Sequence, residues 1–181
     1  MKLNKELRIA VSGKSGCGNT TVSTLLSEKL GIKLINYTFR QLALEKGLTL
    51  AQVIENAKND DSYDEYVDKH QVELALKESC VLGSRLAIWM LKEADFKIYL
   101  LASDEIRAQR VFNREGGDLD EIKRFTEMRD SEDSRRYLKL YGIDNEKYDF
   151  VDLVVDTSKY TPDEIVELIL DRLERLNFIK R

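Results

Sequence analysis

Apolar residues along this chain fall into two alternating patterns, short continuous runs and longer runs with a helical period. The short runs predict five strands, at Ile9–Val11, Lys33–Asn36, Cys80–Leu82, Lys97–Leu101 and Leu153–Asp156. The longer runs predict helices at Thr20–Leu30, Phe39–Lys46, Leu50–Lys58, Tyr63–Glu78 and Leu86–Leu91, over Asp104–Leu140 with a break at Gly116-Gly117, and from Thr161 onward. Strands that alternate with helices predict an α/β fold with a parallel sheet covered on both faces.

Residues that favour helix ends support several of these boundaries. Gly31 is suited to a helix C-cap. Thr49, Ser62 and Ser103 are candidate N-caps, and Thr161 precedes a proline at the first helical position.

Composition narrows the class of protein. With 181 residues, 43% hydrophobic and 34% charged, the chain is expected to fold as one globular domain. A net charge of −4 argues against a nucleic-acid or membrane partner, and no apolar run reaches membrane length. The charged first residues do not resemble a secretion signal, so we expect a cytosolic protein, and a monomer. Two cysteines are too few for a disulfide framework or a zinc site.

The run Ile9–Val11 leads into a glycine-rich loop, Gly13-Lys14-Ser15-Gly16-Cys17-Gly18-Asn19-Thr20-Thr21. Glycines allow successive backbone N–H groups to point at one anion where a helix begins, so this loop is a candidate phosphate site and predicts a P-loop type of sheet. The P-loop pattern asks for G-K-[ST], but Asn19 stands at the lysine position. Thr20 is present and could offer its hydroxyl to Mg²⁺. A simple tight turn is the alternative, and a Rossmann loop fits less well.

Two helical segments carry charged residues on one side. A row at i, i+3 and i+7 comes directly after the fourth predicted strand, and a second row follows on the next helix. Arginine forks match phosphate oxygens, so the two rows suggest a lid over a polyphosphate, at about residues 103–136. A solvated face with acidic partners is the alternative for each single arginine. The rows are Arg107, Arg110 and Arg114, then Arg129, Asp133 and Arg136.

Further candidates lie near the ends of the second and third predicted strands. Arg40 and Arg85 follow these strands, where ligands of open α/β sheets bind, although surface salt bridges are the alternative. Asp68 and Gln71 lie one turn apart on the helix predicted over Tyr63–Glu78. They could read the edge of a base, or face solvent.

Several segments together resemble the short, archaeal-type cytidylate kinases, in order and over nearly the whole chain. They are Gly13 to Thr21, Phe39 to Ala43, Val67 to Gln71, Arg85 to Met90, Ala94 to Ile98, Arg107 to Arg114, Glu115-Gly116, Arg136-Tyr137 and Tyr141 to Asp144.

The resemblance implies a P-loop nucleoside monophosphate kinase that moves the γ-phosphate of ATP to CMP or dCMP with Mg²⁺, with an acceptor-binding insertion at about residues 37–79. By the same resemblance, Arg40 and Arg85 hold the acceptor phosphate, Arg129 and Asp133 hold the region of the acceptor sugar and phosphate, and Arg136 contacts the transferred phosphate. We expect Arg110 to act in transfer and Arg107 to contact the donor.

Two positions depart from the family's pattern. The loop lysine is Asn19, and the acidic residue before the glycine-arginine pair is missing, which gives Gly83-Ser84-Arg85. We predict that Lys14 replaces the loop lysine. Two other functions stay open: a kinase of the same fold for another small acceptor, and a degenerate nucleotide-binding module without transfer.

Overall fold

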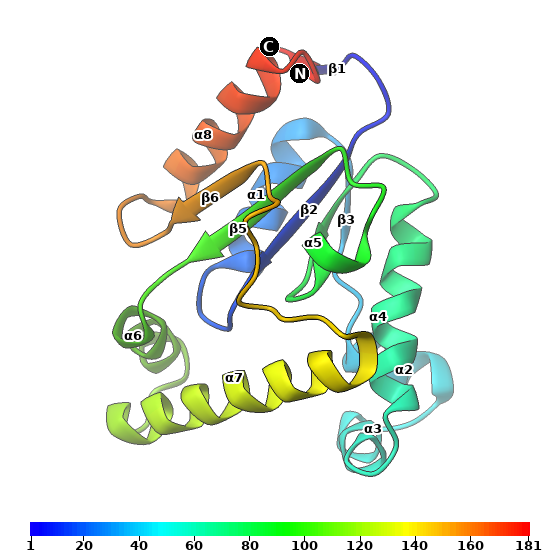
Figure 1. Ribbon diagram of the computed structural model, residues 1–181, viewed down its shortest axis with the longest axis vertical. Helices are drawn as coiled ribbons and strands as arrows, with labels where there is room; N and C mark the ends of the chain where they lie inside the picture. Colours follow the sequence, from blue (N-terminus) through cyan, green and yellow to red (C-terminus); the bar gives the residue numbers. More distant parts are fainter.

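Five parallel strands form the centre of the molecule in a computed structural model that describes every residue, Met1–Arg181 (Figure 1). The elements in chain order are β1 Lys2–Leu3, β2 Arg8–Gly13, α1 Asn19–Leu30, β3 Lys33–Ile35, α2 Phe39–Lys46, α3 Leu50–Ala57, α4 Ser62–Ala75, β4 Cys80–Gly83, α5 Ala87–Met90, β5 Phe96–Leu101, α6 Asp104–Glu115, α7 Leu119–Tyr141, β6 Leu153–Asp156, α8 Pro162–Arg175 and β7 Ile179–Lys180.

The central sheet has the strand order β3-β4-β2-β5-β6, and every neighbouring pair is parallel. Pairing places Val11 of β2 opposite Gly83 of β4 and opposite Ile98 of β5. The carboxyl ends of β2 and β4 therefore meet at one edge, where the glycine-rich loop begins. The predicted α/β fold with a five-stranded parallel sheet is confirmed.

Alternate side chains of β2 enter two different cores. Ile9 and Val11 pack with α1 and α8 on one face, whereas Ala10 packs with α5 and the end of α4 on the other. This two-sided burial explains why β2 reads as a continuous apolar run rather than an alternating one.

Two segments extend beyond the layers of the sheet. The first, which we call the arm, comprises α2, α3 and α4 (residues 39–75) and has a small core of its own around Leu42, Val53 and Val67. The second, which we call the hairpin, comprises α6 and α7 (residues 104–141). In Figure 1, α7 runs along the lower side of the molecule from α6 toward α4. The arm and the hairpin lie where the insertion and the lid were predicted, and those roles remain predictions.

Most predicted helix ends agree with the structure. Thr49, Ser103 and Thr161 cap their helices through side-chain oxygens, and Gly31 ends α1 in a left-handed conformation. The prediction of Ser62 as an N-cap was wrong, because Asp61 holds that position and makes no side-chain cap bond.

The chain termini form a small second sheet that we did not predict. Lys2–Leu3 and Ile179–Lys180 pair as antiparallel strands. None of the helices combines the length and apolar character that a membrane crossing needs.

Candidate active site

A cleft of about 850 Å³ opens at the carboxyl ends of β2, β3 and β4. The glycine-rich loop, the segments after β3 and β4, α4 and both hairpin helices line it. Of its 27 lining residues only five are hydrophobic. The volume lies in the range of small-ligand sites, and ligands of open parallel sheets bind at this edge. The polar lining favours a charged ligand.

The loop between β2 and α1 has the shape of an anion site. Gly16 and Gly18 have positive φ angles of 83° and 95°. A Cβ on Gly16 would lie 3.0 Å from the Cβ and the carbonyl oxygen of Arg107, so only glycine fits there. Gly18 is the N-cap of α1 and provides no side-chain cap. The first N–H groups of α1 therefore lack helical partners and lie beside the cleft, where Thr20 and Thr21 form part of its wall.

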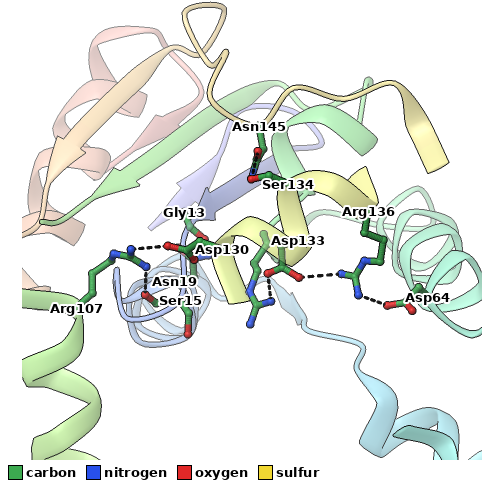
Figure 2. A network of polar contacts seen from close by, with 11 residues as sticks. Gly13, Ser15, Asn19, Asp64, Arg107, Asp130, Asp133, Ser134, Arg136 and Asn145 are labelled. Carbon is green, nitrogen blue, oxygen red and sulfur yellow. Dashed lines mark hydrogen bonds and ion pairs between the residues drawn. The ribbon is translucent and has the colours of Figure 1, made fainter. Parts of the chain in front are cut away.

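Asn19, at the position of the P-loop lysine, turns its amide back onto the loop. Its Nδ2 donates to the carbonyl oxygen of Gly13 at 2.8 Å, and its Oδ1 is buried without a donor (Figure 2). The amide closes the loop but brings no charge to the cleft.

The second departure from the family pattern has a packing reason. A Cβ on Gly83 would lie 2.5 Å from Oγ of Ser23, which is fully buried on α1. Ser23 therefore occupies the space that a side chain at position 83 needs. One cationic and one acidic position of the usual pattern are both neutral here.

Lys14 lies at the entrance of the loop and lines the cleft. Its Nζ is 2.7 Å from Oε1 of Glu146, in the segment that follows α7. Asn145 anchors that segment by accepting a bond of 2.8 Å from the Ser134 hydroxyl on α7, as Figure 2 shows. The ion pair between Lys14 and Glu146 is half exposed, so it contributes little free energy. The ammonium group can therefore exchange the carboxylate for a phosphate.

Arg107 lies behind the loop and not in the cleft. Its side chain is 1% exposed, Nη1 donates to the Ser15 carbonyl at 2.9 Å, and Nη2 is 2.5 Å from Asp130 of α7 (Figure 2). The expectation that Arg107 contacts the donor does not fit this position. The residue instead connects the loop to both helices of the hairpin.

Arg110 lines the cleft one turn further along α6. Its Nη1 donates to the carbonyl of Gly16 at 3.2 Å, and Nη2 donates to the carbonyl of Thr157 at 2.7 Å. Arg114 also lines the cleft but is exposed and paired with the adjacent Glu115. Of the first predicted row, Arg110 alone combines contact with the loop and access to the cleft.

Cys17 belongs to the core rather than to the cleft. It is 2% exposed and packs with α1 and α8, and its N–H donates to the Lys14 carbonyl at 3.1 Å. Burial raises the pKa of its thiol. The prediction that Cys17 contacts a cofactor is therefore not supported by its position.

The second predicted row faces the cleft from α7. Asp133 pairs with Arg85, which follows β4, and accepts a bond of 3.3 Å from Arg136. Arg136 also reaches Asp64 on α4, with Nη1 2.5 Å from Oδ1 (Figure 2). Four alternating charges thus cross the cleft from the sheet to the arm.

Two other predicted arginines have different surroundings. Arg129 lines the cleft, and its guanidinium lies 6.0 Å from the centre of the Phe125 ring. Burial and the nearby positive charge of Arg85 lower its pKa. Arg40 is exposed at the start of α2 and is not part of the cleft wall, so its predicted contact with the acceptor phosphate does not fit this structure.

Asp68 and Gln71 both line the cleft, so the hypothesis that they only face solvent was wrong. Asp68 accepts a bond of 2.8 Å from the hydroxyl of Tyr141. Burial raises the pKa of Asp68 to about 6, against the effects of Tyr141 and Arg136. Gln71 is 2% exposed, and its Oε1 has no hydrogen-bond donor. An unused acceptor oxygen beside a carboxylate suits a ligand that donates hydrogen bonds.

No three His, Cys, Asp or Glu side chains gather closely enough to form a metal site by themselves. Thr20 is exposed at the wall of the cleft, next to the unpartnered N–H groups of α1. Mg²⁺ often takes most of its ligands from substrate phosphates and water. This donor set fits a Mg²⁺ ion that arrives with a nucleotide and takes one hydroxyl from the protein.

Sequence reasoning missed several residues of the cleft. Asp64 lies four residues before Asp68, so the helical period already placed both on one face of α4. Tyr137 lines the cleft from α7, and burial raises its pKa to about 12. No sequence pattern indicated that Glu146 would meet Lys14.

Comparison with protein families and known proteins gives consistent matches. Residues 8–159 match the model of the cytidylate kinase-like family. A protein named cytidylate kinase 2 from Borreliella burgdorferi is 43% identical over 178 residues, which cover 96% of this chain and 99% of the relative. The cytidylate kinase of Archaeoglobus fulgidus is 37% identical over 171 residues, with 93% and 95% coverage.

Solved structures of similar shape support the fold alone. Shikimate kinase from Acinetobacter baumannii has a TM-score of 0.64 at 16% identity, and 96% of each chain is covered. Deoxyadenosine kinase from M. mycoides has a TM-score of 0.59 at 19% identity, with coverage of 93% of this chain and 100% of the other.

Proposed function

The chain belongs to the cytidylate kinase-like family, and from this premise we propose that it transfers the γ-phosphate of ATP to CMP or dCMP. One observation carries the proposal: a single cleft brings an anion-binding loop together with arginines from the sheet and the hairpin. Relatives with 37% and 43% identity over nearly the whole chain are named cytidylate kinases.

We assign the donor to the loop side of the cleft. The free N–H groups at the start of α1 bind its phosphates, and Arg110 adds a positive charge at the edge of the loop. The Thr20 hydroxyl would hold a Mg²⁺ ion on the protein side, and the bound ion would neutralise charge on the transferred phosphate.

We assign the acceptor to the side formed by the arm and α7. Arg85 and Arg129 lie around the region of the acceptor phosphate, and Arg136 lies beside them, where we place the transferred phosphate. Asp133 pairs with both Arg85 and Arg136. Asp68 and Gln71, both on α4, offer acceptor oxygens to the amino group of a cytosine.

The reaction needs no general base from the protein. A phosphate monoester has a second pKa near 6, so it is already ionised at neutral pH. The protein must instead hold two polyanions in line and stabilise the charge that develops between them. The arginines of the cleft provide that stabilisation.

The loop lacks the positive charge of its usual lysine, and we propose that Lys14 provides this charge. Its ammonium lies at the cleft wall in an ion pair that is half exposed. A nucleotide phosphate offers more negative charge than the single carboxylate of Glu146.

Two alternative functions each have an observation in their favour. Asn19 and Gly83 favour a binding module without transfer, because both usual charges of the loop region are missing. The fold alone also allows a kinase for another small acceptor, since shikimate kinases share it.

An assay of ADP release with Mg-ATP and each common nucleoside monophosphate tests the proposal. We expect turnover with CMP and dCMP and little with AMP or GMP. Arg85→Ala should raise the KM for CMP at least about tenfold, as the loss of a charge-assisted phosphate contact does. Arg175→Ala, at an exposed position of α8 outside the cleft, is the control. ATP binding without turnover on any acceptor would favour the binding module.

A further inference from the structure

Asp64 has no part in the assignment above, yet it is one of the few buried charged residues of the chain. It lies in the first turn of α4 and is 9% exposed. Its Oδ1 is 2.5 Å from Nη1 of Arg136, which belongs to α7 (Figure 2). The two residues are 72 positions apart, so this bond joins the arm to the hairpin inside the cleft.

The bond to Asp64 sets the direction of the Arg136 guanidinium across the cleft, which contacts within α7 cannot set. Asp133 lies one turn before Arg136 on the same helix and accepts a longer bond, 3.3 Å, from Nη2. A contact within one helix restrains the side chain relative to α7 only. Asp64 lies on another element, so it sets the direction of the guanidinium across the cleft.

The remaining nitrogen of Arg136 gives no further support. Its Nε is buried and has no hydrogen-bond partner. The two carboxylates therefore hold the guanidinium by its ends, and each end nitrogen keeps a second hydrogen for a ligand.

Burial of the ionised Asp64 carboxylate is unfavourable. Burial raises its pKa, and the positive charge of Arg136 does not fully offset this. The negative charges of Asp133 and Asp61 raise this pKa further. A buried carboxylate that neighbouring carboxylates disfavour is better explained by a task in the site than by stability.

We propose that Asp64 is a positioning residue that aims Arg136 at the transferred phosphate. The proposal rests on the function given above, since it names a further residue of the same reaction. On this proposal the orientation of Arg136 depends on the arm, because the guanidinium is aligned only when α4 packs against α7.

Steady-state kinetics of Asp64→Asn tests this, with Asp61→Asn as the matched control. Asp61 is the N-cap residue of the same helix and pairs with Lys139 of α7, but its side chain is 42% exposed and makes no bond to Arg136. We expect Asp64→Asn to lower kcat about tenfold or more, because a small misplacement of a catalytic group is costly. The KM for ATP should stay within about twofold, as should all constants of Asp61→Asn.

A second variant separates positioning from a purely structural role. In an Arg136→Ala background the carboxylate has lost its partner, so Asp64→Asn should lower kcat no further. An additive loss in the double variant would overturn the proposal. So would a lower KM for CMP at unchanged kcat in Asp64→Asn, which would make Asp64 a competitor of the acceptor phosphate.

Turnover by the wild type separates a failure of the proposed function from a failure of the role of Asp64. If the wild-type chain turns over no monophosphate, the proposed function fails and this inference with it. If the wild type is active and Asp64→Asn retains its kcat, only the inference is overturned.

Discussion

The donor side and the acceptor side of the cleft are held together in different ways. On the donor side, backbone approaches backbone: Gly16 lies against Arg107, and the Arg107 side chain is fully enclosed between the loop and α7. On the acceptor side, α4 and α7 are connected through polar side chains, with Asp64 bonded to Arg136 and Asp68 to Tyr141.

This difference predicts that the donor side is sensitive to substitution and the acceptor side to pH. The donor side depends on steric fit and on one buried arginine, so substitutions there should affect stability and turnover together. The acceptor side depends on carboxylates whose pKa is raised, to about 6 for Asp68. It should therefore respond to pH where the donor side does not.

The largest effect is expected on the donor side, from Arg107→Met. The substitution leaves the half-buried Asp130 carboxylate and the Ser15 carbonyl without their partner. Breaking a buried ion pair on one side costs about 3 to 5 kcal/mol in the free energy of unfolding. Chemical denaturation measures this loss.

Arg114→Met provides the control for this comparison. Arg114 lies on the same helix but is exposed and paired only with its neighbour Glu115. Its effect should stay within about 0.5 kcal/mol. Equal unfolding midpoints for the two variants would contradict the idea that the donor side depends on one buried arginine.

A slightly smaller effect is expected for Lys14→Ala, which tests whether the donor side has a replacement for its missing charge. We expect kcat to fall about a hundredfold, roughly 3 kcal/mol, the size seen when one electrostatic stabiliser of a transition state is removed. Asn19→Lys in the same background should restore part of it. Lys147→Ala, an exposed lysine in the segment that holds Glu146, is the control. Wild-type kcat in Lys14→Ala would show that the loop works without a lysine.

The sequence predicted the layered fold because its signals are local. Apolar runs, glycine stops and caps such as Thr161 depend on near neighbours only, and the structure has them where expected. The pairing of β1 with β7 was not predictable in this way. Each strand has two residues, and their partners lie at opposite ends of the chain.

Most of the predicted residues line the cleft, but some, such as Arg40 and Arg107, do not, and the role of each residue stays a prediction. The spacing of Arg107 and Arg110 on one face of a helix was correct, but spacing does not say which one is covered by the loop. That depends on how closely α6 approaches Gly16, a tertiary property. The bond between Asp64 and Arg136 also depends on the packing of two distant helices.

The smallest effect is expected on the acceptor side, from Asp68→Asn, and its direction depends on pH. The folded pKa of about 6 lies above the ordinary value of 3.8, so the folded state disfavours the ionised carboxylate. Stability from this group is complete below the ordinary pKa and is lost as pH rises through about 6. At pH 8 the wild type bears the full cost, which a shift of this size limits to about 3 kcal/mol.

Partial exposure of Asp68 reduces the expected gain for Asp68→Asn to about 1 to 2 kcal/mol at pH 8. The asparagine oxygen can still accept the Tyr141 hydroxyl, so the packing remains. The gain should shrink through pH 6 and nearly vanish near pH 4, while the KM for CMP rises at pH 8 because the carboxylate is lost. Thermal unfolding at three pH values, with exposed Asp61→Asn as control, measures the first effect. A variant that is less stable than the wild type at pH 8 would show that the Asp68 carboxylate holds the arm to α7 and is not a cost of acceptor binding.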